Sequence, residues 1–97
     1  MSESKIMYIE SIGDKTAIHT DGYGTLVSGR TLREWSADLD PIRFVRPHRT
    51  FIVNFDYVES IEGGMAALAS GANIPVSARS AKAVKENMRE YVRKRSR

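Results

Sequence analysis

Short apolar runs, separated by glycine-containing breaks, dominate the first three quarters of this 97-residue sequence. Runs of this length and spacing are typical of antiparallel strands, because glycine and asparagine tolerate the turns that connect such strands. The predicted strands are residues 5–11, 15–20, 25–29, 44–46, 50–54, 57–62, 65–70 and 73–77. The breaks that contain glycine are residues 12–14, 21–24, 63–64 and 70–73. We therefore predict a mainly β fold with small antiparallel sheets.

Two segments have helical periodicity instead. Thr31 and Glu34 have the spacing of a capping box, in which each side chain bonds the backbone N–H of the other residue at a helix start. Leu32, Trp35 and Leu39 then fall near one face, which predicts one short helix. A C-terminal amphipathic helix is predicted from a single apolar stripe that contains Ala81, Val84, Met88, Tyr91 and Val92.

Length and composition limit the chain to one domain over residues 1–97, with a core over about residues 5–92. The sequence has no cysteine and only two histidines without clustered carboxylates, so we expect no metal, no cofactor and no disulfide. Its apolar runs are too short to span a membrane, and the first residues lack the apolar core of a signal peptide. We therefore expect a cytoplasmic protein.

Positive charge is concentrated at the C-terminal end. Residues 77–97 contain eight Lys and Arg against two Glu, a net charge of +6, whereas the rest of the chain has a net charge of −3. A basic segment is typical of nucleic-acid binders, but terminal helices of many other proteins end in the same way. The charge distribution alone does not decide between these interpretations.

The most informative stretch is Phe44 to Asn54, FVRPHRTFIVN, where cationic or protonatable side chains lie next to an apolar run. Pro47 has no N–H for a strand ladder, so we expect an edge, a bulge or a loop there, with residues 46–50 exposed. Phe51 and Val53 share one face of the next strand and are expected to anchor this loop on the core. The cationic residues then either recognise a ligand or simply cap the strand at the surface.

A family resemblance favours recognition. The segments YIES, IHT, TLREW, FVRPHRTFIVNFDYVESI and IPVSARS occur in an order that resembles the LytTR DNA-binding domain, the output module of many bacterial response regulators in two-component systems. The resemblance covers about residues 6–85. It implies an elongated arrangement of short strands whose loops enter successive major grooves, at promoter sites that are typically direct repeats. It also implies double-stranded DNA as the partner and a possible homodimer on that DNA.

The resemblance further implies three DNA-contacting groups. The turn after the first strand contributes Lys15 and Thr16, with Lys15 as the main donor. The second group is the arginine–histidine loop with Arg46, His48 and Arg49, and the third is Arg79 after the last strand. Ser77, two residues before that arginine, is expected to cap the terminal helix, whose N-terminal amides can then face a phosphate.

We therefore predict sequence-specific binding of double-stranded DNA in transcription regulation, without catalysis or a small-molecule substrate. The alternative is a protein-interaction module that docks through its C-terminal amphipathic helix. A single-strand or RNA binder is a third hypothesis, disfavoured because the aromatic residues are expected in the core rather than in an exposed stacking row. Because the family module usually follows a receiver domain, we expect either an excised domain or a stand-alone regulator.

Overall fold

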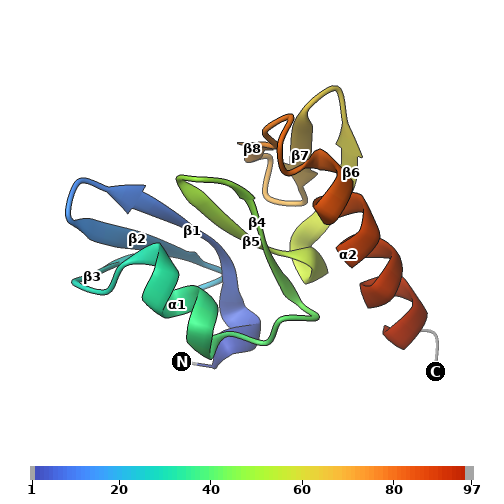
Figure 1. Cartoon of the computed structure of the whole chain (residues 1–97). Coiled ribbons are helices and arrows are strands. Elements are labelled where there is room, and N and C mark those ends of the chain that lie inside the picture. Colours follow the sequence, from blue (N-terminus) through green and yellow to red (C-terminus); the bar gives the residue numbers. More distant parts are fainter. Residues whose placement is uncertain (1, 96–97) are drawn as a thin grey trace.

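The computed structural model describes residues 2–95 and is mainly β, as predicted (Figure 1). Its helical segments are the short 3-10 helices η1 (Glu3–Lys5) and η2 (Phe55–Tyr57) and the α-helices α1 (Leu32–Asp38) and α2 (Ala81–Arg95). Its strands are β1 (Ile6–Ile12), β2 (Lys15–Thr20), β3 (Thr25–Ser28), β4 (Phe44–His48), β5 (Phe51–Asn54), β6 (Val58–Glu62), β7 (Met65–Leu68) and β8 (Asn73–Pro75). Each predicted strand segment therefore contains strand structure.

The strands form two antiparallel sheets. The larger sheet has the order β3-β2-β1-β5-β4, and the smaller one has the order β6-β7-β8. Helix α1 lies against the larger sheet, while α2 runs alongside the smaller sheet at the C-terminal end (Figure 1). The principal extents are 32 × 29 × 26 Å, so the domain is less elongated than the family resemblance implies.

Two hydrophobic clusters lie on opposite faces of the larger sheet, and β5 contributes to both. Ile52 is 1% exposed and packs with Ile9 and Leu32 in the cluster beneath α1. The next residue, Val53, is also 1% exposed and packs with Val84 in the cluster beneath α2. Successive side chains of a strand point to opposite faces, so β5 is buried on both sides.

Helix α1 begins with the predicted capping box. Thr31 Oγ1 accepts a hydrogen bond from the Glu34 backbone N–H, and Glu34 Oε1 accepts one from the Thr31 N–H. The backbone N–H bond from Thr31 is the main cause that lowers the pKa of Glu34. Leu32 and Leu39 are buried and Trp35 is partly buried, as the predicted apolar face requires.

Helix α2 is held against the strands by Asp56. Its carboxylate accepts hydrogen bonds from the Tyr91 hydroxyl and from Arg95, and it pairs with Arg43 at 3.2 Å. Burial, followed by the hydrogen bond to Asp56, raises the pKa of Tyr91. The predicted apolar stripe is correct at Val84 and Tyr91, but Val92 is 52% exposed and lies outside the core.

Pro47 occupies both an edge strand and a bulge. Strand β4 is at the edge of the larger sheet, and its register with β5 shifts between Val45 and His48. The expectation that residues 46–50 are all exposed is wrong for Pro47, which is fully buried. The missing N–H is tolerated because an edge strand at a bulge makes no ladder bond at that position.

The anchor of the following strand also differs from the prediction. Phe51 is only partly buried and packs near Tyr8 and His48, whereas Ile52 and Val53 are buried completely. The prediction assumed that other parts of the chain cover only one face of β5. Because both faces of β5 are covered, the smaller aliphatic residues provide the anchor.

Asn54 joins three segments through one side chain. It is 0% exposed; its Nδ2 donates to the Ile6 carbonyl at 2.9 Å, and its Oδ1 accepts from the Asp56 N–H at 2.9 Å. The latter bond caps η2, so Asn54 starts the turn that follows the strand. The bond to Ile6 additionally fixes β1 to the end of β5.

Asn54→Ala is expected to destabilise the domain by about 2–4 kcal/mol, because it leaves the buried Ile6 carbonyl and the partly buried Asp56 N–H without their partners. The free energy of unfolding can be measured by urea titration. Asn87→Ala is the matched control, since Asn87 is exposed on α2 and alanine favours helix. Equal stability of the two variants would contradict the proposed role of Asn54.

Candidate nucleic-acid interface

The β4–β5 hairpin presents the predicted arginine–histidine group. His48 pairs with Phe51, so the turn contains only Arg49 and Thr50. The Thr50 carbonyl accepts a hydrogen bond from Ser11 N in β1 at 2.9 Å. This bond ties the tip of the hairpin to the neighbouring strand and holds the turn on the sheet.

Some polar groups of the hairpin side chains form hydrogen bonds that support the turn, and others face solvent. Arg46 Nη2 donates to the Arg49 carbonyl at 2.8 Å and thereby braces the turn from its own strand. His48 Nδ1 accepts from the Thr50 backbone N–H at 3.2 Å and also contacts Thr50 Oγ1 at 2.8 Å. Because Nδ1 is the acceptor, the neutral imidazole has its proton on Nε2. That N–H remains available to a ligand.

The segment between β8 and α2 places Arg79 beside this hairpin. Ser77 N donates to the Pro47 carbonyl at 2.9 Å, which links the two segments through main-chain atoms. The Ser77 hydroxyl accepts from Ser80 N at 3.2 Å. It therefore caps the turn that precedes α2 rather than the helix itself, which begins at Ala81.

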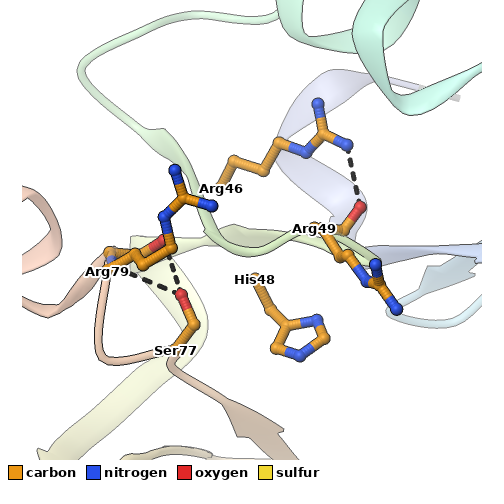
Figure 2. A pocket seen from close by; sticks show the side chains of 6 residues that line it. Arg46, His48, Arg49, Ser77 and Arg79 are labelled. Carbon is orange, nitrogen blue, oxygen red and sulfur yellow. Dashed lines mark hydrogen bonds between the residues drawn. The ribbon is translucent and has the colours of Figure 1, made fainter.

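These residues surround one open cavity of about 320 Å³. Figure 2 shows His48 in the middle, with the Arg79 side chain on one side and the Arg49 side chain on the other. The cavity is lined by Arg46, His48, Arg49, Ser77, Arg79 and Ser80. Two groups that the sequence places about thirty residues apart thus share one surface.

A second cavity, of about 200 Å³, lies on the other side of the hairpin and also contains Arg46 and Arg49. Its lining includes Lys15, the first residue of β2, and Arg33, from α1. The three predicted groups therefore line two neighbouring cavities that share Arg46 and Arg49, and the surface around both cavities is the cationic face. Arg33 was not predicted, although its place in TLREW, one residue after the predicted core position Leu32, indicates a side chain that points away from the core.

Thr16 is the one predicted contact that the structure places inside the protein. It is 1% exposed, its hydroxyl donates to the Arg30 carbonyl at 2.9 Å, and it accepts from Trp35 Nε1 at 3.0 Å. Thr16 alternates with Lys15 along β2, so one residue faces outward and the next faces α1. Thr16 borders the second cavity, but its hydroxyl is already engaged by Arg30 and Trp35, so Lys15 is the better placed of the two to contact a ligand.

The cations of the domain fall into two classes. Within residues 2–95, ion pairs with carboxylates involve Arg30, Arg43, Arg93, Lys94 and Arg95. By contrast, no described carboxylate pairs with the cations of the two cavities, Lys15, Arg33, Arg46, Arg49 and Arg79. The exposed Asp14 at the edge of the second cavity is the only acidic residue among their described linings. Unneutralised charge is thus gathered on this face.

The C-terminal cations contribute less free charge than the sequence indicates. Arg93 and Lys94 pair with Glu90, and Arg95 pairs with Asp56. Arg95 also lies over the Tyr91 ring, 5.6 Å from its centroid. Most of the charge at the described end of α2 is therefore used within the domain.

Other kinds of site have little support within residues 2–95. The described residues contain no group of three or more His, Asp or Glu side chains arranged to hold a metal ion. No described helix is both long enough and apolar enough to cross a membrane. The cationic face is the part of the described surface that best fits a charged ligand.

Comparison with known proteins agrees with this geometry. The family model described as the LytTr DNA-binding domain matches residues 1–89. A similar solved structure is the LytTr DNA-binding domain of a Bacillus cereus protein described as a methyl-accepting/DNA response regulator, with a TM-score of 0.81 and 28% identity. The match covers 88% of this chain and 82% of that one. A search of curated proteins found no match.

The family model covers nearly the whole chain, and the fold agrees with that of the solved relative. The family is non-enzymatic and is named for its binding of DNA, which implies a role in transcription regulation. The unpaired cations described above lie on an open, solvent-facing surface, as binding to an extended polyanion requires. The chain belongs to the LytTR DNA-binding domain family.

Proposed function

We propose that the chain acts as a single domain that binds double-stranded DNA sequence-specifically, through Lys15, Arg46, His48, Arg49 and Arg79. The observation that supports this proposal is the convergence of these side chains on one face without carboxylate partners in residues 2–95. A duplex supplies the missing anions as phosphates, and counterion release makes such contacts favourable.

Base recognition would come from the side chains at the tips. Arg49 and Arg79 each present a guanidinium that can donate to both O6 and N7 of guanine, and His48 Nε2–H can donate to one acceptor. Arg46 already braces the turn, so its remaining N–H groups are better suited to a phosphate. The longest extent of the domain, 32 Å, is close to the roughly 34 Å of one turn of B-DNA.

The first test is a competition experiment with labelled duplex selected from a random-sequence pool. We expect unlabelled duplex of the same sequence to displace the probe far better than either separated strand, because groove contacts need both strands. Equal competition by a single strand would contradict the proposal and favour the single-strand hypothesis.

Arg49→Ala is expected to relax base preference at one position of the site by about 1–3 kcal/mol, with little change in affinity for random duplex. Arg79→Ala should do so at a different position, because Arg79 belongs to another segment. The measurement is a base-substitution binding matrix for each folded variant beside the parent. If both variants keep the parent's matrix, these arginines do not recognise bases.

Arg33→Gln is expected to weaken binding to selected and random duplex alike, since an arginine on α1 near the second cavity is placed for a phosphate rather than a base. The slope of log K against log salt should fall in magnitude by about 0.9, the value for one phosphate contact. The control is Arg93→Gln, which removes the same charge from an arginine that is paired with Glu90. Identical slopes for the two variants would mean that Arg33 makes no contact.

We further propose that two domains bind direct repeats on one face of the duplex, as the family resemblance implies. Repeats separated by about one helical turn should then bind two copies cooperatively. Insertion of roughly five base pairs between them rotates one site to the opposite face and should abolish that cooperativity. Cooperativity that survives the insertion, measured by titration of both templates, would exclude direct contact between neighbours.

A further inference from the structure

An open groove of about 610 Å³ separates β6 from α2, on a part of the domain that the proposed DNA contacts do not use. The groove shares no lining residue with either of the cationic cavities. In Figure 1, the first part of α2 lies next to β6, and the helix then continues beyond the start of that strand. Apolar side chains in the groove include Phe55, Val58, Ile61 and Met88.

One wall of the groove is the free edge of a sheet. Strand β6 is the outer strand of the order β6-β7-β8, so it pairs on one side only. Four consecutive residues, Val58 to Ile61, line the groove. One face of a strand would expose only alternate residues, so this lining indicates that the groove runs along the strand edge. Unpaired N–H and C=O groups at such an edge can accept another strand.

The opposite wall is one face of α2 with two free cations. Lys85, Arg89 and Val92 follow one another at helical spacing, and all three line the groove. Across the part of the chain that the structure describes, neither Lys85 nor Arg89 is paired with a carboxylate. Two carboxylates also line the groove: Asp56 already pairs with Arg43 and Arg95, and Glu59 on the β6 wall pairs with no cation within residues 2–95. Lys85 and Arg89 therefore leave a net positive charge of one in the groove.

We propose that this groove binds an extended, acidic segment of a partner protein, which adds to β6 as a fourth strand. Main-chain hydrogen bonds to the β6 edge would supply affinity, while alternate apolar side chains of the segment fill the space between strand and helix. Carboxylates of the segment would pair with Lys85 and Arg89. A sheet edge beside a helix favours an extended peptide over a helical one, because only an extended backbone satisfies the free edge.

The segment and the duplex bind separate surfaces. The β6–α2 groove lies alongside the helix, whereas the cationic cavities are formed by the β4–β5 hairpin, the turn after β1 and the turn before α2. A partner protein could thus be attached while the domain is on DNA. This inference does not depend on the proposed DNA contacts, because no residue is common to both sites.

The test begins with selection from a library of random peptides of about ten residues, the upper length of a typical strand. We expect the enriched peptides to combine acidic residues with alternating apolar ones. For one such peptide, Lys85→Glu should weaken binding about fivefold or more, through loss of attraction and added repulsion. The matched control is Lys82→Glu, since Lys82 is exposed on the same helix but does not line the groove.

Backbone pairing is tested with two N-methylated versions of the selected peptide, one methylated at odd positions and one at even positions. A strand bonds its neighbour through alternate residues, so one version should lose about tenfold or more in affinity and the other should bind nearly as well as the parent peptide. Peptide affinity should stay within about twofold when the protein is saturated with random duplex.

Several results would overturn the proposal. They are the absence of any enriched peptide, an equal response to Lys82→Glu and Lys85→Glu, equal loss from both methylation patterns, or displacement of the peptide by duplex. Circular dichroism of each variant establishes that the fold is retained. Duplex binding by the parent is measured separately, so failure of the groove and failure of DNA binding are distinguished.

Discussion

Burial of β5 on both faces is the constraint on which the rest of the structure depends. Ile52 and Val53 are neighbours in sequence, yet they belong to the two different hydrophobic clusters. Sliding β5 by one residue would exchange their faces and disrupt both clusters together. The hairpin turn of Arg49 and Thr50 directly precedes β5, so the register that packs the two cores also determines where Arg49 lies.

The positive side chains of the domain have two different roles, which depend on whether they are paired with carboxylates. The paired arginines, such as Arg43 with Asp56 and Arg30 with Asp38, connect elements within the domain. The unpaired ones border the cavities around the β4–β5 hairpin, where solvent screens their mutual repulsion. Holding Arg46, Arg49 and Arg79 near one another opposes folding slightly, and a polyanion relieves that repulsion on binding.

Much of this architecture could be predicted from sequence because it depends on local rules. The capping box of Thr31 and Glu34 and the restriction at Pro47 need only neighbouring residues. Burial could not be predicted as well, because it depends on what packs from elsewhere. Thr16 is hidden by α1, and Val92 is 52% exposed although its neighbour Tyr91 is buried. Arg33 was missed for the same reason, since its neighbours Lys15 and Arg49 come from distant segments.

The hydrogen bond between the Pro47 carbonyl and Ser77 N has a consequence for how such domains can diverge. It uses main-chain atoms only, and so does the bond from Ser11 N to the Thr50 carbonyl. Exchange of Arg49 or Arg79, whose guanidinium groups make no hydrogen bond within residues 2–95, therefore alters which chemical groups are offered while the spacing of the two main-chain segments stays the same. New base sequences can therefore be recognised by substituting side chains at these positions. A change in the distance between the contacts, by contrast, requires a change in the main chain.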